Sequence, residues 1–203
     1  SSSYYVYNNQ PYVYDGDKKD NLGELNTQVE LSNTDFEISF DTSIGSISGK
    51  ATYSLQNSSG SPQECILAMS SGYTCYSITA NGEEITFEKL NNAKSTILFT
   101  IPNDPKVKLT VEYDGIPKVV KNYSDDLIDT TIVSDKYINL METTVFYPSL
   151  RVGGSKESSQ VTGQFTIPDS LVPVLHAAQL DNKVEGNTTD DTVKLLSEDG
   201  NNK

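Results

Sequence analysis

The chain has 203 residues, a formal net charge of −13 and a sequence pI near 4.4. A negative charge of this size repels phosphate backbones and anionic lipid surfaces, so we expect no nucleic-acid partner. Hydrophobic residues make up 35% of the chain and charged residues 21%, a composition typical of a soluble folded domain rather than a disordered segment.

Both ends of the sequence are polar. It contains no signal peptide and no apolar run approaching about 18 residues, so we expect the chain as given neither to be exported nor to be anchored by itself. The abrupt start SSSYYVYNNQ and the end EDGNNK are typical of a fragment cut from a longer protein.

Residues 1–27 form a tyrosine-rich segment that ends in the polar run DGDKKDNLGELN. The alternation of Tyr5 with Tyr7, and of Tyr12 with Tyr14, predicts a linker that docks on the following domain as an edge strand. The alternative is that these tyrosines lie at a membrane interface, just outside a preceding transmembrane helix.

Residues 28–203 are predicted to form one β-sandwich domain. Apolar residues recur there with a period of two, which indicates half-buried antiparallel strands. The inward sets are Phe36, Ile38 and Phe40; Ile47, Gly49, Ala51, Tyr53 and Leu55; Leu67 and Met69; Ile78 and Ala80; Ile97, Phe99 and Ile101; Val107, Leu109, Val111 and Tyr113; and Val161, Gly163, Phe165 and Ile167.

Two local signals mark the connections. Asn81-Gly82 predicts a type I′ hairpin between YSITA and EEITFEKL, because both central residues of that turn need a positive φ. The run from Asn57 to Pro62 consists of residues that favour turns and ends the preceding strand.

The second half of the chain is less regular. Residues 114–136 lose the alternation and gather aspartates, so we expect a surface insertion with one helical turn near 125–129. Further strands are predicted within 137–148, 172–180 and 192–197.

No residue pattern indicates catalysis, and we predict no catalytic residue, no metal site and no cofactor. The single histidine, His176, is followed by Ala177, so the zinc motif H-E-x-x-H cannot form. The Asp15-Gly16-Asp17 run departs from the order of a calcium loop.

Cys65 and Cys75 are too few for a disulfide scaffold and are wrongly spaced for a C-x-x-C motif. We expect two reduced thiols; a bridge is the alternative if their strands pair. Glycosylation sequons begin at Asn57, Asn122 and Asn187, which predicts surface loops at these positions.

Several of these segments, in order, resemble one known family. FEISFD, GSISGKATYSLQN, SITANGEEITFE, LTVEYDGIP and the FYP of Phe146 to Pro148 are similar in sequence and spacing to the N-terminal β-domain of aminopeptidase N type zinc peptidases (gluzincins). The resemblance extends over about residues 28–180. It implies a saddle-shaped antiparallel β-domain that packs beside a thermolysin-like catalytic domain and closes one side of its cleft.

The chain departs from soluble members of the family because it lacks the segment A-R-x-x-F-P-C-x-D-E-P near Phe146. Here it resembles membrane-embedded, transporter-permease-like relatives, which implies an extracellular or cell-surface domain. By position, Glu142 matches the family residue that lines the first substrate pocket and contacts the free amine. The alternative for Glu142 is an exposed strand residue.

The sequence therefore predicts an all-β, saddle-like antiparallel β-sandwich without catalytic activity of its own. The resemblance implies two partners, a downstream peptidase-like domain of the same polypeptide and a peptide bound in the cleft, with membrane contact only through flanking segments. The alternative is a free-standing adhesion or carbohydrate-binding β-sandwich whose exposed tyrosines contact the ligand.

Overall fold

The computed structural model of the protein describes ten stretches of the chain. These are residues 2–7, 10–15, 26–89, 96–117, 132–136, 138–139, 146–153, 160–167, 183–185 and 190–197. Within them every regular element is a strand, and no helix there has the length and apolarity needed to cross a bilayer.

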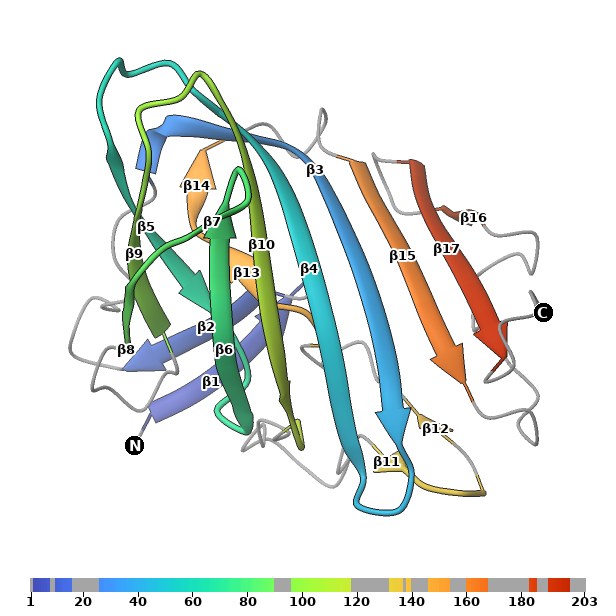
Figure 1. Cartoon of the computed structure of the whole chain (residues 1–203). Helices are drawn as coiled ribbons and strands as arrows, with labels where there is room; N and C mark the ends of the chain where they lie inside the picture. Colours follow the sequence, from blue (N-terminus) through green and yellow to red (C-terminus); the bar gives the residue numbers. More distant parts are fainter. Residues whose placement is uncertain are drawn as a thin grey trace.

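A long twisted sheet forms the larger layer of the molecule (Figure 1). Its strand order is β16-β17-β15-β3-β4-β10-β6-β7, and the short strand β14 also pairs with β3. In chain order these strands are β3 (Asn26–Asp41), β4 (Ser46–Asn57), β6 (Tyr73–Ala80), β7 (Glu83–Glu84), β10 (Lys106–Gly115), β14 (Val152–Gly153), β15 (Gln160–Ile167), β16 (Lys183–Glu185) and β17 (Asp190–Ser197).

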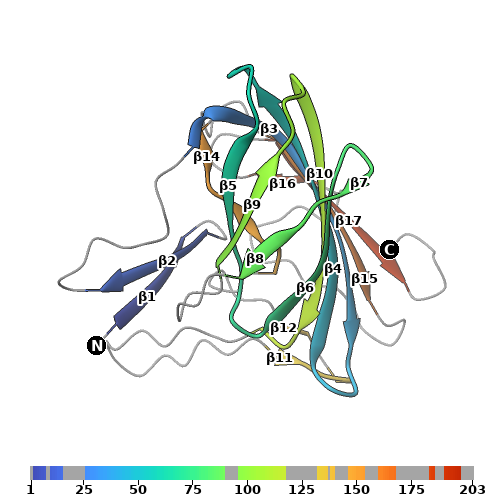
Figure 2. The same ribbon diagram turned by 60° about the vertical axis from the view of Figure 1, so that its left-hand side comes forward.

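A small sheet, ordered β13-β5-β9-β8, packs against one part of the long sheet (Figure 2). Its strands are β5 (Gln63–Ala68), β8 (Phe87–Lys89), β9 (Thr96–Ile101) and β13 (Ser149–Leu150). The core between the sheets consists of the inward residues of both, as the period of two predicts. The all-β sandwich predicted from the sequence is confirmed.

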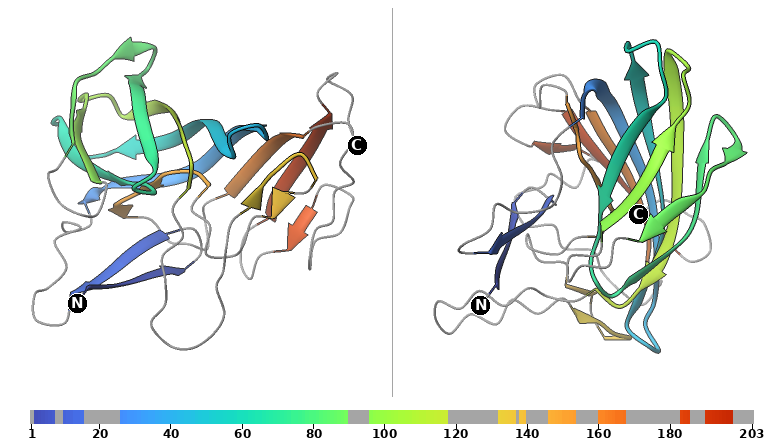
Figure 3. Two further views of the ribbon diagram at one scale, coloured as in Figure 1. Left: turned by 90° about the horizontal axis from the view of Figure 1, so that it is seen from below. Right: turned by 90° about the vertical axis from the view of Figure 1, so that its left-hand side faces the viewer.

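The register of the long sheet is antiparallel at its centre and parallel at one side. β3 pairs with β4, and β4 with β10, in antiparallel register, whereas β15 runs parallel to both β3 and β17. Alternation alone does not distinguish these cases, because side chains alternate between faces in both kinds of strand. Figure 3 shows that β15 and β17 lie beyond the part of the long sheet that faces the small sheet.

The Asn81-Gly82 turn is present as predicted. Asn81 has φ 52° and Gly82 has φ 84°, the two positive values that a type I′ turn requires. The Asn81 side chain also connects this turn to the start of β10. Its Oδ1 accepts a hydrogen bond from Lys108 N at 2.8 Å, and its Nδ2 donates to Asp104 Oδ2 at 3.0 Å and to Lys106 O at 3.2 Å.

The segment after this turn joins the two layers. β7 belongs to the long sheet and β8 to the small sheet, and the chain crosses between them at Ile85 and Thr86. Ile85 N donates to Ile78 O at 2.9 Å and Ile85 packs against the core. The single strand expected over EEITFEKL is therefore two short strands in different sheets.

Two further expectations need correction. The N-terminal strands β1 (Ser2–Tyr7) and β2 (Gln10–Asp15) pair with each other as a separate hairpin, not as an edge strand of either sheet. Asn57 is the last residue of β4 and is 4% exposed, so the acceptor residue of its sequon is buried, whereas Ser58 and Ser59 lie in the loop that follows, as expected. Its Nδ2 donates to Ser61 O at 2.9 Å and to Pro102 O at 3.2 Å.

Other expectations fall on residues outside the described stretches. These include the helical turn near 125–129, the strand within 172–180, and the sequons at Asn122 and Asn187. In the insertion and the segment after it, the described residues form β11 (Ile132–Val133) and β12 (Ile138–Asn139), which pair with each other.

Replacing Asn81 by Ala should destabilise the protein by about 2–4 kcal/mol. The change removes three side-chain hydrogen bonds, and it puts an alanine, whose Cβ makes a positive φ unfavourable, at a backbone position with φ 52°. Asn81→Gly is the matched control, since it loses the same hydrogen bonds but accepts the φ. We expect Asn81→Gly to lie between the wild type and Asn81→Ala in denaturant unfolding. Equal stability of all three proteins would contradict the bonding role of Asn81.

Candidate functional site

Residues 146–153, here called the bridge segment, connect the two sheets. Within it β13 pairs with β5 of the small sheet, and β14 pairs with β3 of the long sheet. Between them, Arg151 N donates to Ile66 O at 2.8 Å, and Asn26 N donates to Arg151 O at 3.3 Å. The segment therefore closes one side of the sandwich through backbone hydrogen bonds to both layers.

Two tyrosines of the central strands hold the start of the bridge segment. The Tyr113 hydroxyl on β10 donates to Phe146 O at 2.5 Å, and the Tyr53 hydroxyl on β4 donates to Pro148 O. Both tyrosines are buried, and burial raises the pKa of each hydroxyl well above its usual value. Each remains a neutral donor at any moderate pH, and each donates a hydrogen bond to a carbonyl of the bridge segment.

The rings of Phe146 and Tyr147 complete an aromatic cluster on β3 and β15. Phe36 stacks on Tyr147 with centroids 5.1 Å apart, and it meets Phe146 at 5.4 Å and Phe165 at 5.3 Å in edge-to-face contacts. Phe40 stacks on Phe165 at 6.1 Å. Such pairs contribute about 0.5–1.5 kcal/mol each beyond the area that they bury.

Two glycines make room for these rings. Gly163 lies directly opposite Phe36 in the β15–β3 register, and a Cβ at Gly163 would overlap the Phe36 ring. Gly49 lies opposite Tyr113 in the β4–β10 register, and a Cβ there would overlap the Tyr113 ring. An aromatic side chain covers the bare backbone at both positions, so the ring lies flat against the sheet.

The outer rim of the aromatic cluster reaches the surface. Phe36 and Phe165 are buried, whereas Phe40, Phe146 and Tyr147 are half-buried. The cluster thus has a fixed inner layer and a partly accessible apolar edge. This edge, together with the bridge segment, is the candidate functional site.

The structure does not describe the two residues that the sequence analysis considered for substrate binding and for zinc binding. Glu142, the predicted contact to a substrate amine, and His176 lie outside the described residues. Among the described residues, no three histidine, cysteine or acidic side chains come together in a way that could hold a metal ion. The tyrosines that fix the bridge segment appeared in the sequence only as inward members of alternating strands.

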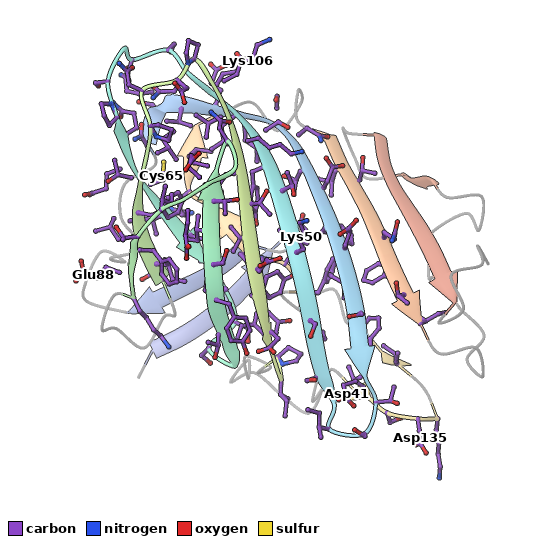
Figure 4. The ribbon with its side chains drawn as sticks, viewed as in Figure 1. Asp41, Lys50, Cys65, Glu88, Lys106 and Asp135 are labelled. Atoms are coloured by element: carbon purple, nitrogen blue, oxygen red, sulfur yellow. The ribbon has the colours of Figure 1, made fainter. Side chains whose placement is uncertain are left out.

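Both cysteines are free thiols, as predicted. Cys65 is buried on β5 of the small sheet (Figure 4), and Cys75 is half-buried on β6 of the long sheet. Their strands belong to different sheets and do not pair, which removes the geometry that a hairpin bridge needs. Burial raises the pKa of Cys65 to about 12 and that of Cys75 to about 11.

No protein-family model matches the sequence, and no curated protein matches it by sequence. The solved structures similar to this fold include an M1 zinc metallopeptidase from Deinococcus radiodurans with a bound Tyr-Ser-Ala substrate. It is 12% identical with a TM-score of 0.40, and the match covers 53% of this chain and 24% of the peptidase. Native yeast leukotriene A4 hydrolase is 18% identical with a TM-score of 0.39, covering 45% and 15% of the two chains.

The bestatin complex of yeast leukotriene A4 hydrolase is 17% identical with a TM-score of 0.39, and the match covers 52% of this chain and 17% of the hydrolase. The chain thus spans less than a quarter of the length of each of these enzymes. A likeness of this extent does not by itself establish a common function.

Replacing Tyr113 or Tyr53 by Phe should each destabilise the protein by about 1–3 kcal/mol, because each change removes a hydrogen bond from a buried tyrosine to the bridge segment. Tyr73→Phe is the matched control. Tyr73 packs on Tyr113 at 5.2 Å, and its buried hydroxyl has no hydrogen-bond partner. We expect Tyr73→Phe to be neutral or slightly stabilising in urea unfolding. A loss for Tyr73→Phe as large as that for Tyr113→Phe would refute the assignment of these hydroxyl bonds.

Thiol titration of the denatured protein should count two free groups. In the native protein at pH 8 both should react far more slowly than a free cysteine, because only the thiolate is nucleophilic and burial raises both pKa values. Cys75 should react before Cys65, since it is less buried. A count of zero after denaturation would show a disulfide and contradict this prediction.

Proposed function

We propose that this chain is a non-catalytic β-domain of a larger peptidase-like protein, equivalent to the N-terminal domain of the aminopeptidase N type. The order of its sequence motifs supports this proposal, as does the absence of H-E-x-x-H from a chain with one histidine. A domain of this kind supplies one surface of a shared cleft, while the partner domain supplies the zinc chemistry.

The observation that carries the proposal is the fixation of Phe146 to Pro148. Two buried hydroxyls and the stacked rings of Phe36 and Tyr147 hold this motif on the central strands. A rigid support of this kind is what a substrate-contacting segment needs, because a binding residue on a loose loop loses precision. In the family that the motif resembles, the residue at the position of Glu142 lies shortly before this proline.

The finer proposal concerns location. The resemblance near Phe146 favours the membrane-embedded, transporter-permease-like relatives, so we propose an extracellular or cell-surface domain of a membrane protein. The partly accessible aromatic edge of Phe40, Phe146 and Tyr147 supports docking of a neighbouring domain, because half-buried aromatic rings are common at protein interfaces.

One observation favours the second candidate, a carbohydrate-binding sandwich. Tyr76 on β6 is 58% exposed, and its hydroxyl donates to Asp114 on the neighbouring strand β10. An exposed ring with an adjacent carboxylate is a pattern that could stack on a sugar and bond its hydroxyls. One hydrogen bond to Asp114 holds this side chain, however, whereas the bridge segment is bonded to both sheets.

Reading the complete open frame tests the proposal most directly. We expect an apolar span of about 20 residues upstream and a thermolysin-like helical domain downstream, with H-E-x-x-H intact or degenerate. The 203-residue chain alone should bind no stoichiometric zinc and cleave no aminoacyl anilide. A natural protein that starts with a cleavable signal peptide and stops near Lys203 would reject the proposal, and glycan binding that Tyr76→Ala abolishes would establish the alternative.

A further inference from the structure

Arg151 is the only arginine of the chain and lies in the middle of the bridge segment. Its backbone is fixed on both sides, since its N–H donates to Ile66 O of the small sheet and its carbonyl accepts from Asn26 N of the long sheet. The side chain therefore leaves a rigid point between the two layers. The residue as a whole is half-buried.

The buried part of this guanidinium is not compensated. Arg151 Nε is buried and has no hydrogen-bond partner, and no carboxylate of the described residues forms an ion pair with Arg151. Burial lowers the pKa of Arg151, but a guanidinium stays protonated at any physiological pH. An uncompensated half-buried cation is costly.

The chemistry of the guanidinium indicates which kind of group would pair with Arg151. Guanidinium groups pair best with planar carboxylates or with phosphates. The net charge of −13 repels a phosphate dianion more strongly than a single carboxylate, which favours the carboxylate. Nε is buried, so a carboxylate on a docking polypeptide would pair with the terminal nitrogens of the guanidinium, and Nε itself would stay without a partner.

We propose that Arg151 is an interface residue, which pairs with a carboxylate on the polypeptide that docks against the bridge segment. This inference rests on the proposed function, because it places the neighbouring domain of the same protein over this flank. Docking would complete a bidentate pair and exclude water from it, so the cation contributes to recognition rather than to the stability of this chain. The half-buried rings of Phe146 and Tyr147, on the same segment, supply the apolar part of the contact.

The first experiment uses the chain alone. Arg151→Met keeps the length of the stem and removes the charge, and Lys50→Met on the exposed face of β4 (Figure 4) is the control for loss of one positive charge. If Arg151 awaits a partner, Arg151→Met should melt within about 2 °C of the wild type or above it, as Lys50→Met should. A fall of more than about 5 °C for Arg151→Met alone would overturn the proposal by showing a structural role.

The second experiment tests recognition of a carboxylate without a partner domain. About 0.5 M sodium acetate should raise the melting temperature of the wild type by about 2 °C more than sodium chloride of the same concentration does. Arg151→Met should lose this difference, Arg151→Lys should keep only part of it, and Lys50→Met should keep all of it. An acetate effect that is the same in wild type and Arg151→Met would overturn the proposal.

The third experiment tests the docked polypeptide. The remainder of the full-length protein, expressed separately, should bind the wild-type chain about tenfold or more tightly than it binds Arg151→Met, with Lys50→Met unchanged. Binding that Arg151→Met leaves unchanged would overturn the proposed role of Arg151 while leaving the proposed function intact. If the wild type does not bind the remainder at all, the proposed function and the docked partner both fail.

Discussion

The arrangement of this protein depends on two hydrogen bonds in its interior, from Tyr53 to the carbonyl of Pro148 and from Tyr113 to that of Phe146. The bridge segment is distant in sequence from both tyrosines and adds only two short strands, so ladder bonds alone would hold it weakly. A buried carbonyl without a donor costs about 1–3 kcal/mol. The two hydroxyls remove that cost just before the segment enters β13, three residues or more ahead of its passage to the long sheet at Arg151.

The aromatic packing follows from this fixation. Once Phe146 and Tyr147 lie on the central strands, their rings cover Phe36, and Phe36 in turn occupies the space above Gly163. A side chain at Gly163 would displace Phe36 and, through it, Tyr147. The glycines, the rings and the hydroxyl bonds therefore form one continuous set of contacts from β15 to β10, and that set leaves Arg151 at its edge.

The sequence predicted the positions of the strands more completely than it predicted which strands pair with each other. Alternation placed the inward residues of β3, β4, β6, β9, β10 and β15 correctly, because the period of two is a local property of an extended chain with one buried face. It did not predict the parallel pairing of β15 or the division of EEITFEKL between two sheets, since pairing depends on distant segments. The roles of Tyr53 and Tyr113 were hidden for the same reason: their partners are 95 and 33 residues away. Arg151 carried no sequence signal beyond being the only arginine.

The burial of Asn57 affects how the protein can be produced. Its Nδ2 uses its hydrogens to bond Ser61 O and Pro102 O, and its Oδ1 accepts from the backbone N–H and the hydroxyl of Ser59. A glycan is bulky and is attached through this same nitrogen, so it would take one of these donors and could not fit beside a side chain that is 4% exposed. In a secretory pathway that glycosylates the emerging chain before it folds, modification at Asn57 would compete with closure of the loop between β4 and β5. A host that adds no such sugars, or an Asn57-Ser58-Ser59 sequence altered at its third position, avoids this competition.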